Sequence, residues 1–311
     1  MAWIETHINS KVLGMEMSLN VIVPQEKQPY TMDSNFKVLW LLHGGSGDET
    51  AWLRMSNIER FANEYGIAVI IPGGLHSCFT DMEHGGKFFT YMTEELPPII
   101  RQLFPRLSTE REDHYIAGFS NGGYGCLRLG LARPDLYAAI GAFSAGNKAD
   151  IPFVNDGSEK SKGRVVLFGD GDIKNTDHDL KHLAMKASKS GQALPRIYHA
   201  CGSLDPWLDL NEIMRDFFYE RNNTYDYTYH EAEGYGHTWD FWEMEILRFF
   251  DYLKLEKDDT KNLNFSLFSS NNCINNLTAN HPFLQSHMFS SSFLLIGLII
   301  NPWSQSRQFP L

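Results

Sequence analysis

Several features are scarce in this 311-residue sequence, and each scarcity excludes a class of protein. The 4 cysteines show no CxxC spacing and are too few for a disulfide framework. Basic residues are outnumbered, 27 against 38 acidic, so the net charge of −11 argues against binding to a nucleic-acid backbone. The N-terminus lacks the basic stretch and apolar run of a secretory signal. We therefore expect a cytoplasmic protein of a reducing compartment.

The last fifty residues almost completely lack charge. Residues 262–311 contain no Asp, Glu or Lys and only Arg307, whereas residues 1–261 carry a net charge of −12. The apolar run at 293–300 would span about 12 Å as a helix, far short of a bilayer core of about 30 Å. We predict a folded domain at 1–257 and a polar, Asn/Ser-rich, disordered tail at 258–311. A membrane-associated or partner-binding tail is the alternative.

What the first 261 residues do contain is an alternation of apolar runs and amphipathic stretches, typical of strands joined by crossover helices. The runs at 36–42 and 67–71 are nearly continuous, as expected for strands buried on both faces. Further strands are expected at 3–9, 15–23, 114–119, 138–143, 165–168, 197–200 and 225–231. Helices are expected at 50–64, 88–103, 122–132, 177–188, 210–221 and 239–253. The pattern predicts one α/β domain with a mostly parallel sheet and helices on both faces.

The strongest motif is G-x-S-x-G at residues 118–122, with Ser120 at its centre. It follows an expected strand and opens an expected helix, the context in which this motif forms a sharp turn that presents a nucleophile. Glycines are needed on either side of the serine, because side chains there would collide with the neighbouring strand and helix. The adjacent helix N-terminus favours developing negative charge. The motif predicts Ser120 as a nucleophile, with a plain glycine-rich turn as the alternative.

A second glycine-rich segment, HGGSG at residues 43–47, follows the strand expected at 36–42. No GK[ST] follows it, so it is not a phosphate-binding P-loop. A loop in this position can aim bare N–H groups at the oxyanion of a tetrahedral intermediate. We assign the oxyanion donors to the backbone N–H groups of Gly45 and Asn121. His43 is expected to hold the loop by hydrogen bonds rather than to act in catalysis.

Histidine is the side chain best suited to act as a general base at neutral pH. The candidates after Ser120 are His178, His182, His199, His230 and His237. Of these, His237 lies in a glycine-flanked loop between the last expected strand and the last expected helix, whereas the others fall within expected strands or a charged helical stretch. The position of His237 favours it as the base.

The acid that orients this base should follow a strand and precede His237 in the chain. Asp205 lies 32 residues before His237, after the strand expected at 197–200. It would accept the imidazole Nδ1–H and stabilise the imidazolium. Asp170 and Asp172 are rivals because they follow the strand expected at 165–168, and Asp209 is a weaker one near a helix start. Asp205 is favoured because its strand should lie beside the strand that leads to His237.

With these motifs the chain resembles the esterase D-like branch of the α/β-hydrolase superfamily, and most closely its tributyrin (short-chain acyl) esterases. The resemblance extends from about residue 3 to residue 253. The segments that carry it include LLHGGSGDETAW (41–52), FTDM (79–82), the Ser120 motif, CGSLD (201–205) and GHTWDFW (236–242). It implies an α/β-hydrolase fold and hydrolysis of carboxylic esters with small acyl groups, without a metal or an organic cofactor.

Carried over position by position, Ser120, Asp205 and His237 match the family's catalytic triad, and Gly45 and Asn121 match its oxyanion donors. Many relatives have Met after the nucleophile, where this chain has Asn121. The backbone donor is retained, but an amide replaces a thioether near the acyl group, so the acyl preference stays open.

The sequence thus predicts a serine carboxylesterase that hydrolyses short-chain acyl esters through an acyl-enzyme. Alternatives are a thioesterase of the S-formylglutathione hydrolase type, an acetyl-xylan or feruloyl esterase, an acyltransferase, or a non-catalytic scaffold. Trp52, Trp207 and Trp239 flank the motifs as candidate pocket residues, with ordinary core packing equally expected. The expected partner is a small-molecule ester, and the acidic composition favours a neutral one. Homo-oligomerisation is left open.

Overall fold

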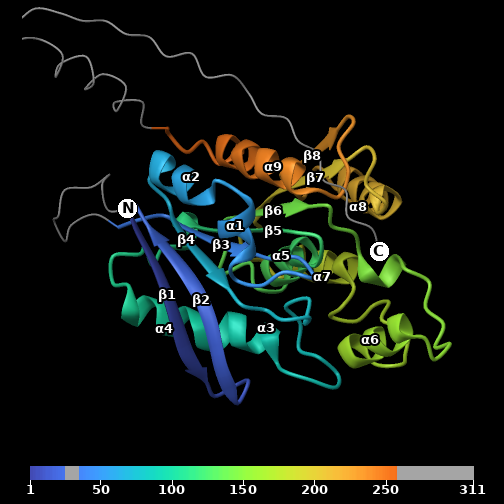
Figure 1. Ribbon diagram of the computed structural model, residues 1–311. Coiled ribbons are helices and arrows are strands. Elements are labelled where there is room, and N and C mark those ends of the chain that lie inside the picture. The colour runs from blue at the N-terminus through green and yellow to red at the C-terminus, as the bar shows by residue number, and fades with distance from the viewer. Residues whose placement is uncertain (25–34, 258–311) are drawn as a thin grey trace, which may run out of the picture. The chain divides into compact units, whose positions relative to one another are not determined.

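The computed structural model describes residues 1–24 and 35–257, so the predicted tail at 258–311 lies outside the described residues. Its strands are β1 (Ala2–Ser10), β2 (Met15–Val23), β3 (Val38–Leu42), β4 (Ala68–Pro72), β5 (His114–Phe119), β6 (Ala139–Phe143), β7 (Arg196–Gly202) and β8 (Tyr227–Ala232). They form an eight-stranded sheet in the order β1-β2-β4-β3-β5-β6-β7-β8 (Figure 1). β1 and β2 pair antiparallel at one edge, and the strands from β4 to β8 run parallel, which confirms the predicted mostly parallel sheet.

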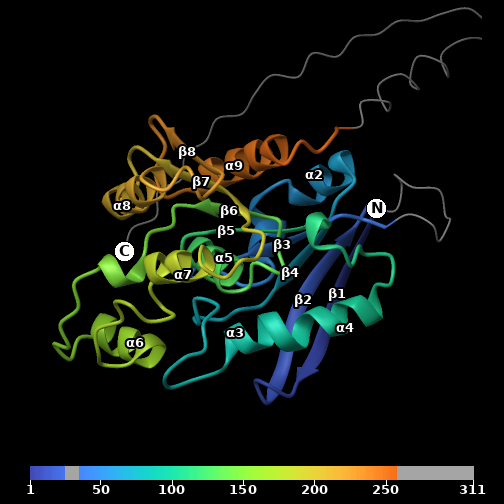
Figure 2. The ribbon, with the colours of Figure 1, turned by 180° about the vertical axis from the view of Figure 1, so that it is seen from behind.

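Helices cover both faces of this sheet, also as predicted. The described helices are α1 (Ala51–Met55), α2 (Ile58–Tyr65), α3 (Phe88–Thr90), α4 (Leu96–Leu103), α5 (Asn121–Ala132), α6 (Glu159–Phe168), α7 (Leu180–Ala187), α8 (Leu208–Tyr219) and α9 (Trp239–Tyr252), together with a π-helical turn at Tyr91–Glu95 and short 3-10 turns at Arg111–Asp113 and Lys148–Asp150. α1, α2 and α9 lie on one face, and α4, α5 and α7 lie on the other (Figures 1 and 2). Over the described ranges, no helix has the length and apolar character needed to cross a membrane.

The central strand β3 explains how the sheet builds a core on each face. Its side chains alternate, so that Val38, Trp40 and Leu42 join one buried cluster while Leu39 and Leu41 join the other. Successive residues of a strand point to opposite faces, and a continuous apolar strand therefore supplies both cores.

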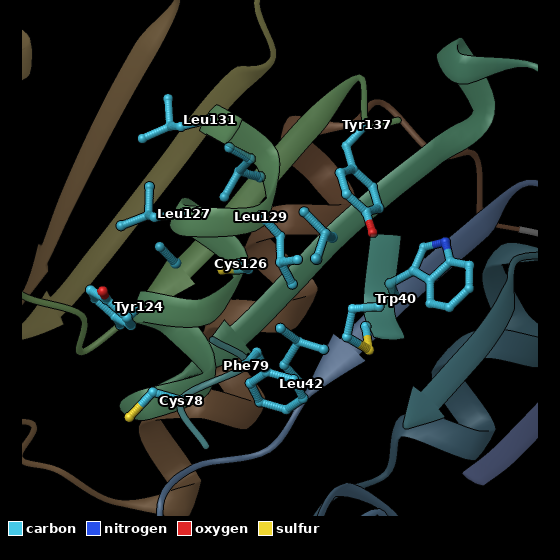
Figure 3. Close-up of a cluster of buried hydrophobic side chains, with 14 of the residues drawn as sticks. Trp40, Leu42, Cys78, Phe79, Tyr124, Cys126, Leu127, Leu129, Leu131 and Tyr137 are labelled. Atoms are coloured by element: carbon cyan, nitrogen blue, oxygen red, sulfur yellow. The ribbon is translucent and has the colours of Figure 1, made fainter. Parts of the chain in front are cut away.

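Helix α5, which begins directly after Ser120, packs closely against the sheet. Figure 3 shows its side chains Tyr124, Leu127 and Leu129 within the first of these cores. A Cβ added at Gly123 would lie 2.7 Å from the Cβ of Ala145, so only glycine allows the helix to approach this closely. The start of α5 is thereby held against the end of the sheet.

The strand predicted at 165–168 is wrong, because these residues form the end of α6. Ser158 caps this helix by accepting a hydrogen bond from the Ser161 N–H, and Gly169 ends it with φ 78°. Four apolar residues are too few to distinguish a strand from a helix end, and the exposed Val166 shows that the run is not buried on both faces.

The helix predicted at 50–64 is divided into α1 and α2 at Ser56 and Asn57. The Ser56 hydroxyl donates to the Trp52 carbonyl and accepts from the Ile58 N–H, offering the backbone an alternative to continuing the helix. The side chain and N–H of Asn57 both donate to Glu243 of α9, which fixes the break in place.

Candidate active site

The turn between β5 and α5 holds Ser120 in an unusual backbone conformation. Its φ of 55° and ψ of −120° lie in a region that non-glycine residues rarely adopt, and its N–H donates to the Phe143 carbonyl at 2.8 Å. A Cβ added at Gly122 would lie 2.4 Å from the His43 carbonyl oxygen, and one added at Gly118 would lie 2.8 Å from the Gly122 oxygen. Both flanking positions therefore require glycine, as the motif predicts.

The loop after β3 lies directly against this turn. A Cβ added at Gly45 would come within 2.5 Å of the Asn121 side-chain nitrogen, so the two residues assigned as oxyanion donors are close neighbours. The buried His43 ring fixes the loop: its Nε2 accepts the Gly74 N–H at 2.9 Å, and its Nδ1 therefore donates to the Gly44 carbonyl at 2.8 Å. Burial lowers the pKa of His43, which favours this neutral form.

Asp205 and His237 meet at the same end of the sheet. β7 and β8 are parallel neighbours, so the loops that follow them emerge side by side, as predicted. The Asp205 Oδ2 lies 2.8 Å from the His237 Nδ1, with the Asp205 side chain fully buried and that of His237 25% exposed. The Asp205 Oδ1 accepts the Trp207 N–H at 2.9 Å.

The environment of Asp205 keeps its carboxylate ionised. Burial alone would raise the pKa, but hydrogen bonds from His237, from the Ser144 hydroxyl and from the Trp207 N–H outweigh it and hold the pKa below its ordinary value. A charged, oriented carboxylate can fix the histidine tautomer with Nδ1 protonated and Nε2 free to accept a proton.

Sequence reasoning missed two residues of this network. Ser144 directly follows β6, has φ 52°, and accepts the indole N–H of Trp242 at 3.0 Å in addition to its bond with Asp205. The Trp242 ring also packs edge-on to the His237 ring, with centroids 5.0 Å apart. The signal for Ser144 was its position after a central strand, because the carboxyl ends of parallel strands share one edge of the sheet.

Ser120 opens onto a cavity of about 250 Å³. The cavity is lined by Ser120, Asn121, Ser144, Gly146, Lys148, Ile151, Trp207 and Leu210. Within the described part of the chain, hydrogen bonding joins His237 to Asp205 but not to the Ser120 hydroxyl. The structure therefore brings the acid and the histidine into direct contact and sets the serine at the wall of a cavity between neighbouring loops.

The three predicted tryptophans have different environments. Trp207 is 40% exposed and lines the cavity. Trp52 is fully buried, donates its indole N–H to the Leu42 carbonyl at 3.0 Å and packs edge-on to Phe119, so it offers no surface to a ligand. Trp239 is partly buried and packs against both Trp52 and Phe119. For Trp52 the core-packing alternative holds.

The rival acids lie elsewhere. Asp170 and Asp172 follow helix α6 rather than a strand, and Asp170 accepts a hydrogen bond from Asn155. Asp209 lies in the first turn of α8, where an acidic side chain complements the helix dipole. The hydrogen-bonding geometry thus favours Asp205 over all three.

Three of the other candidate histidines have structural partners. His199 is buried between the Tyr227 hydroxyl and the Asn211 amide, and desolvation lowers its pKa to about 4. His178 contacts the Thr80 hydroxyl, and burial lowers its pKa to about 4 as well. His230 bonds to a glutamate of α9.

Comparisons with known proteins identify the family of this chain. The model of the Esterase family matches residues 10–250. An acetyl esterase from Caldicellulosiruptor saccharolyticus is 32% identical over 271 residues, covering 83% of this chain and all of that protein. An S-formylglutathione hydrolase from Paracoccus denitrificans is 26% identical over 256 residues, covering 75% of this chain and 85% of that protein.

A solved structure extends the comparison to three dimensions. The fluorophosphonate-binding serine hydrolase F of Staphylococcus aureus superimposes with a TM-score of 0.70 at 31% identity, covering 81% of this chain and 98% of that one. Together with the family match and the fold, these similarities show that the chain belongs to the Esterase family, in the esterase D-like branch of the α/β hydrolases, and is a serine carboxylic ester hydrolase.

Proposed function

We propose that this serine esterase hydrolyses short-chain acyl esters, of the acetyl or butyryl type, with Ser120, His237 and Asp205 as its catalytic triad. The observation that carries the proposal is the 2.8 Å hydrogen bond between the buried Asp205 carboxylate and His237. It lies at the edge of the sheet where the strained Ser120 turn also emerges.

In the proposed reaction the His237 Nε2 removes the Ser120 hydroxyl proton as Oγ attacks the ester carbonyl carbon. The N–H groups of Gly45 and Asn121 stabilise the negative charge on the carbonyl oxygen. The C–O bond to the alcohol then breaks, and His237 gives its proton to the leaving alkoxide. Water, deprotonated by the same histidine, hydrolyses the acyl-enzyme and regenerates the Ser120 hydroxyl.

The contact between Ser120 and His237 is expected to shorten when substrate fills the cavity, since catalytic hydrogen bonds are often long without substrate. Ser144 supports the acid: its hydroxyl bonds to Asp205 and its oxygen is fixed by Trp242. The acid thus keeps one orientation while His237 gains and loses its proton.

One observation supports a small acyl group: the relative that is 32% identical is an acetyl esterase. A thioester substrate is the second candidate, because the relative that is 26% identical is an S-formylglutathione hydrolase. A cytoplasmic location is proposed with it, and the free, buried Cys78, Cys126 and Cys201 are consistent with a reducing compartment.

Hydrolysis rates across an acyl series test this function. For p-nitrophenyl esters, we expect kcat/KM for acetate and butyrate to exceed that for octanoate by about 10-fold or more, if this chain shares the preference for a small acyl group that its acetyl esterase relative is named for. S-formylglutathione assayed alongside decides between ester and thioester. A preference for octanoate, or equal rates with the Ser120→Ala enzyme, would overturn the proposal.

A further inference from the structure

A second, larger cavity adjoins the one at Ser120. Its volume is about 490 Å³, and it shares Asn121, Lys148, Ile151 and Trp207 with the smaller cavity. A substrate whose reacting carbonyl lies at Ser120 can therefore extend past these four residues into the larger space. Among the four, Lys148 carries the only charge.

Lys148 is held at this junction by a well-ordered turn. Its Nζ donates to the Asn121 Oδ1 at 2.8 Å, so the ammonium lies beside the residue that follows Ser120. The preceding residue, Asn147, is fully buried and caps the turn Lys148–Asp150, accepting the Leu180 N–H at 3.0 Å and donating to Asp179 at 2.9 Å. The position of the lysine backbone is thus fixed before any ligand binds.

The Lys148 ammonium has no acidic partner in the residues that the structure describes. Its neighbour Asp150 pairs instead with Lys181, at 2.7 Å. An ammonium has three N–H donors, and the Asn121 amide uses one of them. A half-buried charge without a counter-ion is costly, and burial correspondingly lowers the pKa of Lys148. A bound anion would supply the missing partner.

The charge around the larger cavity is opposite to that of the whole chain. Lys148, Lys160 and Arg164 line it together with one acidic residue, Asp156, whereas the chain as a whole carries −11. Arg164 is itself fixed, since its guanidinium donates to the carbonyl oxygens of Gly169 and Gly171. This local excess of positive charge favours an anionic ligand, contrary to the neutral ester expected from overall composition.

We infer that Lys148 is a specificity-determining residue, whose ammonium binds a carboxylate carried by the ester substrate a few bonds from the reacting carbonyl. This inference rests on the proposed function and narrows its substrate class to esters bearing a carboxylate. The carboxylate can belong to the acyl part or to the alcohol part, because both extend from the carbon that Ser120 attacks.

Two matched substrate pairs distinguish these sources. Monomethyl adipate against dimethyl adipate places the carboxylate on the acyl side, and 4-acetoxybenzoate against its methyl ester places it on the alcohol side. For each pair we take the ratio of kcat/KM for the anionic ester to that for the neutral one. In at least one pair, Lys148→Met should lower this ratio about 10-fold or more, because a charge-assisted hydrogen bond is lost.

Three controls accompany this measurement. Lys148→Arg retains the charge and should keep the ratio nearer to the wild-type value. Lys189→Met removes one positive charge from an exposed site and should leave the ratio unchanged. Ligand binding to the Ser120→Ala enzyme, followed by NMR titration, provides a readout that does not depend on turnover. There monomethyl adipate or 4-acetoxybenzoate should bind more tightly than its neutral partner, and adding Lys148→Met should abolish the difference.

The outcomes separate the two proposals. If wild-type and Ser120→Ala enzymes hydrolyse the neutral esters equally, the proposed function fails, while the binding difference still tests Lys148. If Lys148→Met changes neither ratio nor the binding difference, the inference is wrong, even where Ser120-dependent hydrolysis is normal.

Discussion

Two charged groups near the Ser120 turn, Asp205 and Lys148, have opposite environments. The Asp205 carboxylate is fully buried and bonded to His237, Ser144 and the Trp207 N–H. The Lys148 ammonium lines the cavity at Ser120, bonds to a neutral amide and, among the described residues, forms no ion pair. The Asp205 charge is held in one orientation by groups of the protein, whereas the Lys148 charge, which has no acidic partner among the described residues, is available to an anionic ligand. The difference separates the acid–base machinery from substrate recognition.

The largest expected effect on kcat comes from a change at Asp205, which is paired with His237. Asp205→Asn keeps the shape of the side chain but removes its charge and presents the wrong hydrogen-bonding group to His237. We expect kcat to fall about 10³–10⁴-fold, because the histidine loses its tautomer and the stabilisation of its imidazolium. Steady-state kinetics with p-nitrophenyl acetate measure this. Asp209→Asn, an exposed change on α8, is the matched control, and an equal loss in both variants would contradict the assignment.

A smaller effect is expected where the loop after β3 meets the Ser120 turn. Gly122→Ala introduces a Cβ 2.4 Å from the His43 backbone oxygen, so the loop and the turn must move apart, and the Gly45 N–H moves away from the proposed oxyanion position. Losing one such donor costs about 10²–10³-fold in kcat. Gly171→Ala, where a Cβ meets nothing within 4 Å, should leave kcat unchanged. A Gly122→Ala enzyme with wild-type kcat would show that this loop does not stabilise the transition state.

The smallest expected effect is on the pH dependence of folding stability. It comes from buried histidines, which, unlike Asp205, are neutral. The pKa values of His43, His178 and His199 are lowered by burial, the last two to about 4. Their neutral forms therefore contribute stability that is present above the unfolded pKa of about 6.5 and is lost as the pH falls below it.

We expect the melting temperature to fall by about 5 °C or more between pH 7 and pH 5, as calorimetry or circular dichroism can follow. His178→Gln should make the dependence shallower, whereas His84→Gln, on the exposed surface, should not change it. A melting temperature that stays constant or rises over this interval would contradict the assignment of buried neutral histidines.

Much of the fold follows from local patterns. The buried strands have continuous apolar runs, and the glycines of the Ser120 turn are required by contacts as short as 2.4 Å. The strands that lead to Asp205 and His237, β7 and β8, are expected to be neighbours, and the structure confirms this: they pair in parallel. Where the local signal is short, as at the four apolar residues that end α6, it predicts the wrong element, and the helix begins at the capping residue Ser158.

The rest depends on contacts between distant parts of the chain. Ser144 reaches Asp205 and Trp242 only because β6 lies between β5 and β7 in the sheet. Lys148 is one of many lysines in the sequence, and its significance comes from the cavity that it shares with Asn121 and from the pairing of Asp150 with another lysine. The local sequence around Lys148 predicts neither of these contacts.

Covalent labelling tests the central claim, that Ser120 is the nucleophile served by this network, most directly. The protein should be incubated with a fluorophosphonate probe, digested and analysed by mass spectrometry. We predict one stoichiometric adduct on the peptide that contains Ser120, a strongly reduced labelling rate in Asp205→Asn, and no adduct in Ser120→Ala. An adduct on a different serine, or undiminished labelling of the Ser120→Ala enzyme, would contradict the account.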